Sequence, residues 1–270
     1  MPPLSVTIIT RNEASNIAEA LQSVSWAAET IVVDAESTDD TVAIARRHAT
    51  RVLVRPWNGY GDQKNFAAGL AQHDWILSID ADERVTPELA DDIRRTLLSD
   101  PPVRGFRIPR VTFHLGHWIK STDWYPDYQL RLYDRRYARW NNRHVHESVT
   151  VDGDVRRLQG DLQHFAYRDL SHHLETIDRY TSLAARQMFD EGRRASVVDL
   201  LFHPPLAFLR NYILRLGIRD GLPGLIISLL NSYYVMLKFA KLWELQAALA
   251  KVRSTEGIAA NGAGRRGPRT

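Results

Sequence analysis

Short apolar runs alternate with helix-like stretches along the first hundred residues of the chain. Runs rich in β-branched residues predict strands over Leu4–Thr10, Trp75–Asp80 and residues 30–34 and 50–54. Apolar residues at helical spacing between these runs predict helices over residues 12–26, 39–48 and 63–71. Short, continuous apolar strands separated by helices are typical of a parallel sheet that is covered on both faces. The pattern therefore predicts an α/β nucleotide-binding architecture.

The pattern changes over residues 101–162, which are rich in Trp, Tyr, His and Arg. Strand-like pieces lie at residues 105–110 and 129–134, and Asn141-Asn142 has the composition of a turn. We expect antiparallel strands and loops here that complete the sheet and form a pocket wall.

From Ser171 onward the apolar spacing is helical, with expected breaks at Pro204-Pro205 and at residues 221–224. Residues 225–239 are very apolar but contain polar positions, and they fall short of the ~20 residues that a spanning helix needs. Basic and aromatic residues flank them, which fits a membrane-surface element. The alternative is packing on the same domain or on another subunit. We predict a catalytic domain over residues 1–165, a membrane-associating helical extension over 166–250 and a disordered basic tail over 251–270.

The composition is that of an ordinary globular protein, with 44% hydrophobic and 25% charged residues in 270. The absence of Cys excludes disulfides and thiolate metal sites, and no signal-peptide pattern precedes the first strand. Both features favour the cytoplasm. The net charge of +3 is too small to indicate nucleic-acid binding. The chain has thirty arginines and five lysines, and this excess of arginine fits either codon usage or phosphate-bearing partners.

Polar clusters fall where the predicted strands end or a helix opens: residues 10–13, 34–40, 63–65 and 80–83. Ligands of open parallel sheets bind beyond the carboxyl ends of the strands, so these clusters predict one site. Asp80 and Asp82, two residues apart after a strand, suit a hard divalent cation. Lys64 is placed to meet a phosphate, and Asp34 to accept hydrogen bonds from a ribose or a base. Simpler roles are solvation for Lys64 and helix capping for Asp34, Ser37 and Asp39.

Two common nucleotide motifs are missing from the sequence. No Gly-x-Gly-x-x-Gly follows the first strand, and no Gly-x-x-x-x-Gly-Lys-Ser/Thr is present. These absences argue against a dinucleotide oxidoreductase and a P-loop NTPase.

Taken in order, the clusters resemble the motif series of family-2 inverting glycosyltransferases, whose fold is called type A. The motifs are Thr10-Arg11-Asn12-Glu13, Val33-Asp34 with Ser37-Thr38-Asp39-Asp40-Thr41, Gln63-Lys64-Asn65 and Asp80-Ala81-Asp82-Glu83. The resemblance covers about residues 4–150. It implies an enzyme that binds a nucleotide-diphosphate sugar, with Asp80 and Asp82 holding the diphosphate and Mg²⁺ or Mn²⁺. The expected donor-binding residues are Thr10, Asn12, Glu13, Asp34, Ser37, Asp39, Lys64, Asp80, Ala81 and Asp82.

Later segments resemble the bacterial subgroup that includes lipopolysaccharide-core glucosyltransferases. They are residues 124–133 (WYPDYQLRLY), Val145-His146-Glu147 and Arg219-Asp220-Gly221-x-x-Gly224. The implied acceptor is a cell-envelope glycan or glycolipid, at the inner face of a membrane. The expected acceptor-binding residues are Trp124, Tyr125, Arg131 and His146.

Inversion needs a carboxylate that deprotonates the acceptor hydroxyl as it attacks the anomeric carbon. Glu147 and Asp127 are both candidates. The simpler roles are a salt bridge to arginine for Glu147 and a turn after proline for Asp127. Neither His144, His146 nor His164 has convincing zinc spacing with a carboxylate.

Two other functions compete with sugar transfer. A nucleotidyltransferase that builds nucleotide-sugars would share the sheet and the metal carboxylates, but it usually has a Gly-rich basic loop where Arg11-Asn12-Glu13 stands here. A non-catalytic membrane-surface scaffold would have no need of intact carboxylates at Asp80 and Asp82.

Overall fold

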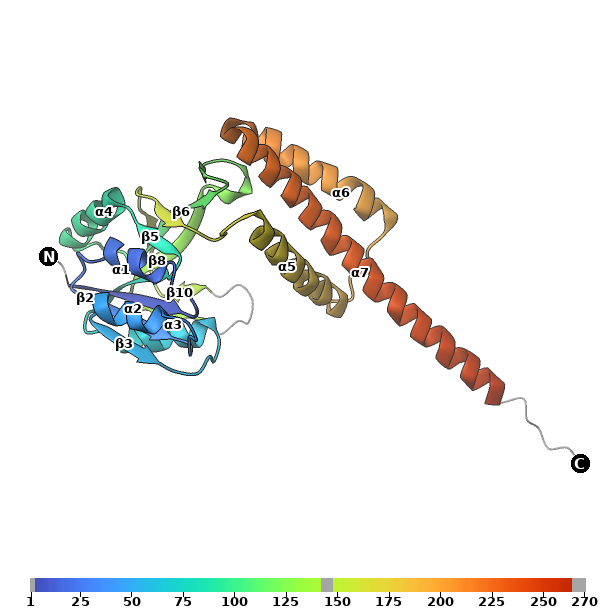
Figure 1. The fold of residues 1–270 in the computed structure, drawn as a ribbon, viewed down its shortest axis with the longest axis horizontal. Coiled ribbons are helices and arrows are strands. Elements are labelled where there is room, and N and C mark those ends of the chain that lie inside the picture. The colour runs from blue at the N-terminus through green and yellow to red at the C-terminus, as the bar shows by residue number, and fades with distance from the viewer. Residues whose placement is uncertain (1–2, 142–147, 264–270) are drawn as a thin grey trace, which may run out of the picture. The chain divides into compact units, whose positions relative to one another are not determined.

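The computed structural model describes residues 3–141 and 148–263 and divides the chain into two units, Met1–Ala166 and Tyr167–Thr270 (Figure 1). Side chains are described as far as residue 249. Each unit has a hydrophobic core of its own. The predicted boundary after residue 165 lies one residue from the division between the units.

The first unit is built on one mixed sheet. Its strands follow the order β3-β2-β1-β4-β8-β6-β12-β5, and β7 and β11 also pair with β6. The strands of this sheet are β1 (Leu4–Thr10), β2 (Glu29–Asp34), β3 (Arg51–Val54), β4 (Trp75–Asp80), β5 (Glu83–Val85), β6 (Gly105–His114), β7 (His117–Ile119), β8 (Asp127–Asp134), β11 (Val155–Arg157) and β12 (Leu162–His164). A separate hairpin pairs β9 (Ala138–Trp140) with β10 (Val149–Val151).

The amino-terminal half of the sheet is parallel, as the sequence pattern predicts. β1 pairs in parallel with β2 on one side and with β4 on the other. Every residue of β1 and β2 is buried, which explains their continuous apolar runs. The helices are α1 (Ile17–Ser23), α2 (Thr41–His48), α3 (Tyr60–Gly69) and α4 (Pro87–Leu98).

The helices cover both faces of the sheet and create two cores. Ile17, Ala45 and Leu89 bring α1, α2 and α4 into one core. Ala67 and Trp140 bring α3 and the β9–β10 hairpin into the other. Because both faces are covered, ligands have access at the strand ends.

The direction of the sheet changes at β4. β8 lies antiparallel to β4, and β6 lies antiparallel to β8 with an irregularity between Phe106 and Arg107. The predicted antiparallel strands of residues 105–110 and 129–134 are present and longer than expected. A 3₁₀ turn, η1 (Thr122–Trp124), leads into β8. This arrangement brings the first residues of β8 beside the carboxyl end of β4.

The second unit is helical. It contains α5 (Leu170–Asp190), α6 (Val197–Leu209), a π-helical turn η2 (Arg210–Leu214), a 3₁₀ turn η3 (Gly217–Asp220) and α7 (Gly221–Ala263). Both α5 and α6 pack against α7. The first turn of α7 lies close to the backbone of η3, and this requires glycine at position 224. A Cβ on Gly224 would lie 1.9 Å from the carbonyl oxygen of Gly217.

Two features of this unit differ from expectation. Pro204 and Pro205 lie inside α6, so the predicted break there is wrong. Proline's fixed φ is itself helical, and α6 packs on α7, where the Ser232 hydroxyl donates to the carbonyl oxygen of Pro204 at 2.8 Å. In addition, α7 runs through residues 251–263 of the expected disordered tail, and residues 264–270 lie outside the described chain.

One helical segment among the described residues is long and apolar enough to cross a membrane, judged by length and composition. It spans Gly217–Leu249, and its 18-residue apolar window has a mean hydropathy of 1.3, with 22% of that window buried in the protein. The helical segment that contains the very apolar residues 225–239 is therefore longer than that stretch.

Candidate active site

The loops after β1 and β2 are joined by hydrogen bonds. The backbone N–H of Asn12 donates to Ser37 Oγ at 2.8 Å, and the Asn12 side chain accepts from the N–H of Thr38 at 2.8 Å. The N–H of Glu13 donates to Thr41 Oγ1 at 2.8 Å. Asn12 has a φ of +55°, in the left-handed region that asparagine tolerates better than most residues. These bonds explain why α1 begins at Ile17 rather than at the predicted residue 12.

Asp39 belongs to the same loop contact. Its carboxylate accepts hydrogen bonds from the Thr41 hydroxyl and from the N–H of Ala14 at 3.1 Å. Burial would raise the pKa of Asp39, but the hydrogen bonds from Thr41 and Ala14 hold it below its ordinary value. Asn12, Ser37 and Asp39 thus shape the loops, and their contact with a nucleotide stays a prediction.

Thr10 and Asp34 lie side by side where β1 and β2 end, as register partners. Both residues are buried. Asp34 accepts hydrogen bonds from the N–H and hydroxyl of Ser37, whereas the hydroxyl of Thr10 has no hydrogen-bond partner among the described residues. A buried hydroxyl without a partner is costly, so the end of β1 offers a polar atom to a ligand.

At the end of β4, Asp80 lies between two buried cations. Lys64 of α3 places its Nζ 3.0 Å from Asp80 Oδ1, and Arg131 of β8 places its Nη2 2.5 Å from Asp80 Oδ2. Burial would raise the pKa of Asp80, but the charges of Arg131 and Lys64 hold it far below its usual range. Lys64 also lies over the ring of Trp140, 4.3 Å from its centroid.

Arg131 does not have the position that the sequence suggests. The sequence predicts that it binds the acceptor, but it is buried and makes ion pairs with Asp80 and Glu83. The reason is topological, because the antiparallel pairing of β8 with β4 turns Arg131 towards the strand-end carboxylates. Although burial would lower the pKa of Arg131, Asp80 and Glu83 raise it.

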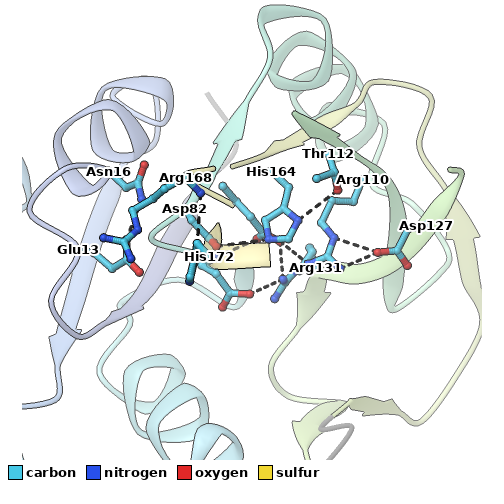
Figure 2. Close-up of polar contacts among 12 residues, drawn as sticks. Glu13, Asn16, Asp82, Arg110, Thr112, Asp127, Arg131, His164, Arg168 and His172 are labelled. Carbon is cyan, nitrogen blue, oxygen red and sulfur yellow. Dashed lines mark hydrogen bonds and ion pairs between the residues drawn. The ribbon is translucent and has the colours of Figure 1, made fainter. Parts of the chain in front are cut away.

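Asp82 lies apart from these ion pairs and faces a histidine (Figure 2). His164 Nε2 of β12 is 3.3 Å from Asp82 Oδ2, and His164 Nδ1 is 3.4 Å from the hydroxyl of Thr112. The described residues contain no group of three or more His, Cys, Asp or Glu that could hold a metal. A carboxylate and an imidazole together nevertheless suit a divalent cation whose other positions are left open to a diphosphate and water.

Asp127 opens β8 after the cis peptide bond between Tyr125 and Pro126. Its Oδ2 accepts from Nε and Nη2 of Arg110 at 2.9 and 2.6 Å (Figure 2), and its Oδ1 accepts from Gln129 at 2.7 Å. The side chain is 32% exposed, so solvent or a substrate can reach it.

The residues expected to bind the acceptor are only partly brought together. The ring of Trp124 lies 5.8 Å from that of His114, and the Tyr125 hydroxyl donates to Asp161 at 3.0 Å. Burial, followed by the Asp161 carboxylate, raises the pKa of Tyr125 to about 12. His146 and Glu147 lie outside the described residues, so their predicted roles stay predictions.

Three residues of this region had no assigned role in the sequence-based prediction. Glu83 belongs to the Asp80–Glu83 run in the sequence. The spacing of two carboxylates in that run predicts a cation site at Asp80 and Asp82 and gives no role to Glu83. His164 lacks a recognisable zinc spacing because its partner Asp82 is far away in sequence. The one sequence signal for Arg110 is an arginine placed within a predicted strand. Its pairing with Glu83 and Asp127 is visible only in the structure.

Residues 5–151 match the family described as glycosyl transferase family 2, which covers more than half of the chain. The chain belongs to this family. It is 31% identical over 257 residues to the lipopolysaccharide core biosynthesis glycosyltransferase LpsC of Rhizobium meliloti, covering 92% of this chain and 95% of LpsC. It is 33% identical to an uncharacterized glycosyltransferase of Rickettsia typhi, with 91% and 88% of the two chains covered.

The expected family and enzyme class are thus confirmed for this glycosyltransferase, and so is its α/β fold class. Among solved structures it is similar to S. aureus TarS, with a TM-score of 0.46 and 13% identity. That match covers 92% of this chain and 91% of the TarS chain.

Proposed function

We propose that this glycosyltransferase moves a sugar from a nucleotide-diphosphate sugar to a cell-envelope glycan or glycolipid, such as the lipopolysaccharide core, with Mg²⁺ or Mn²⁺. The observation that carries the proposal is the group at the end of β4, where Asp82 faces His164 beside the paired Asp80. The name of the LpsC relative supports the lipopolysaccharide acceptor.

The nucleotide is proposed to lie over the ends of β1 and β2. The Thr10 hydroxyl, which has no partner within the described part of the chain, can donate or accept a hydrogen bond, and the buried Asp34 carboxylate can accept one. Glu13 stands in the adjoining loop, where its carboxylate accepts a hydrogen bond from Asn16 at 2.8 Å. These three groups match the hydroxyls and N–H groups of a ribose and a base.

Asp82 and His164 would hold the divalent cation. Both oxygens of Asp80 are already paired with Lys64 and Arg131, so Asp80 contributes charge close to the site. When bound, the cation neutralises charge that develops on the departing diphosphate. Lys64 adds a positive charge at the same end of the sheet.

Asp127 is proposed as the general base, with Glu147 as the alternative. The Asp127 carboxylate takes the proton from an acceptor hydroxyl while that oxygen forms a bond to the anomeric carbon. The bond from the anomeric carbon to the diphosphate breaks, and the nucleoside diphosphate leaves with the electron pair. Arg110 and Gln129 fix the carboxylate in place for this attack.

A donor screen tests the proposal. UDP-, GDP-, dTDP- and ADP-sugars are added separately with Mn²⁺, and thermal unfolding is followed. A matching donor at a hundred times its Kd stabilises the protein by about 2.7 kcal/mol, which raises the Tm by about 5–10 °C. The same donor should then release nucleoside diphosphate when acceptor is added. Donor binding without any release would favour the scaffold, and pyrophosphate-dependent breakdown of the donor would favour the nucleotidyltransferase.

The second unit is proposed to lie on the inner face of a membrane. Large apolar side chains of α6 and the turns after it are exposed: Val197, Val198, Leu201, Phe202, Leu206, Leu209, Ile213, Leu214 and Ile218. Arginines at positions 210, 215 and 219 share this segment, and a surface of apolar and basic residues suits an anionic bilayer.

Replacing Leu201 and Leu206 together by glutamate should abolish co-sedimentation with anionic phospholipid vesicles. Each leucine is about 60% exposed, so the folded state should tolerate the change. Leu98→Glu is the matched control, because Leu98 is at least as exposed but lies on α4 of the first unit. Undiminished binding of the double variant would contradict the assignment of this surface.

A further inference from the structure

Six buried or half-buried side chains form an unbroken series of alternating charge across the first unit. The series runs from Lys64 through Asp80, Arg131, Glu83 and Arg110 to Asp127, and it joins α3, β4, β5, β6 and β8. Its N–O distances are 3.0, 2.5, 2.6, 3.1 and 2.6 Å in that order. Three cations and three anions balance, so Asp82 contributes a negative charge beyond the balanced series.

Glu83 is the centre of this series. Its Oε1 accepts from both Arg131 and Arg110, and its Oε2 accepts from the backbone N–H of Asp80 at 2.9 Å. The side chain is fully buried. One carboxylate therefore holds the backbone of the β4 end and both guanidinium groups that reach Asp80 and Asp127.

This position gives Glu83 a part in catalysis without contact to a reacting atom. Sugar transfer requires the base and the anomeric carbon in a fixed relation, and an error of about 1 Å costs about 10²-fold in rate. Without the charge of Glu83, the two guanidinium groups face each other with no anion between them. Arg110 would then shift, and Asp127 would move with it.

We propose that Glu83 is the positioning residue that sets Asp127 relative to the donor end of β4, acting through Arg110 and Arg131. This inference rests on the proposed function, in which Asp127 is the base and Asp80 lies beside the donor diphosphate. It concerns the rate of transfer rather than donor affinity, because Glu83 is sealed from the surface by its partners.

The test is Glu83→Gln, which keeps the shape of the side chain and removes its charge. The assay uses the donor identified by the screen, lipopolysaccharide core as acceptor, and Mn²⁺. Relative to the wild-type enzyme, we expect kcat to fall about 100-fold, whereas the donor KM changes by less than about threefold. Glu29→Gln is the matched control. Glu29 is a buried glutamate of the same sheet, at the amino end of β2, where it accepts from Ser5 and from the N–H of Gln72. Its kcat and KM should stay within about threefold of wild type.

A second variant covers the case in which Glu83→Gln does not fold. Arg110→Lys keeps the charge of a half-buried residue but cannot bond Glu83 and Asp127 together. It should show the same separation of kcat from KM. In the double variant Glu83→Gln/Arg110→Lys, the two losses should not multiply, because both interrupt one connection.

The outcomes separate this inference from the proposed function. An active wild type whose kcat survives in both Glu83→Gln and Arg110→Lys would overturn the positioning role alone. Losses that multiply in the double variant, or an equal loss in Glu29→Gln, would do the same. A wild type that transfers no sugar from any donor would overturn the proposed function and the inference together.

Discussion

Asp127→Asn is expected to lower kcat by about 10²- to 10⁴-fold, the usual contribution of a general base. Asparagine has nearly the same shape and can still accept from Arg110, but it cannot take a proton from the acceptor hydroxyl. The donor KM should remain near the wild-type value, because the residues proposed to hold the nucleotide lie at the ends of β1 and β2. Steady-state release of nucleoside diphosphate, measured with acceptor present, gives both constants.

Asp92→Asn is a suitable control for this change. Asp92 lies on α4, is partly buried and accepts from the backbone N–H of Gln159 at 2.8 Å. Its kcat should stay within about twofold of wild type. Glu147→Gln belongs in the same experiment. If Asp127→Asn retains its rate and Glu147→Gln loses it, the base is Glu147 and the assignment given to Asp127 is wrong.

The second large effect is expected for Asp82→Ala. Loss of the carboxylate that faces His164 should weaken the cation's hold on the departing diphosphate, which is worth several kcal/mol of transition-state stabilisation. This corresponds to a fall of about 10²- to 10³-fold in release of nucleoside diphosphate. The Mn²⁺ concentration that gives half-maximal rate should rise in Asp82→Ala. It should also rise in His164→Ala, by about 10- to 100-fold.

Asp74→Ala provides the comparison for Asp82. Asp74 immediately precedes β4, at the opposite end of the strand, and pairs with Arg136 at 3.2 Å. It should leave both the rate and the Mn²⁺ dependence unchanged. If Asp82→Ala and Asp74→Ala show the same Mn²⁺ dependence, the proposal that the cation binds at the end of β4 is wrong.

The parallel half of the sheet was predictable from sequence, to within one residue at each strand. β1 and β4 are buried on both faces, so their apolar runs identify them without reference to the rest of the chain. The strand-end clusters could be located for the same reason. β5, β7 and β12 are three residues long, too short to show a period, and they were not predicted.

The partners of the site residues were less predictable. Asp80 and Arg131 are 51 residues apart, and Asp82 in the turn after β4 meets His164 on β12, so neither pair has a sequence spacing to recognise. The sequence predicts an acceptor-binding role for Arg131, and arginines are mostly exposed in proteins, but this arginine is buried. What places it inside is the antiparallel β4–β8 pairing, which depends on the whole fold.

The reversal of strand direction at β4 also bears on how the protein assembles. The parallel half can form from neighbouring βα units and already contains Lys64, but the second counter-charge of Asp80 is Arg131 on β8, which the chain supplies later. Contacts between distant segments form slowly, because loop-closure entropy must be overcome first. Until β6 and β8 are in place, Asp80 lacks Arg131, and the neighbouring Glu83 lacks both of its arginine partners and resists burial. The active site is therefore expected to be completed among the last steps of folding, so that a chain competent for sugar transfer is one whose sheet is whole.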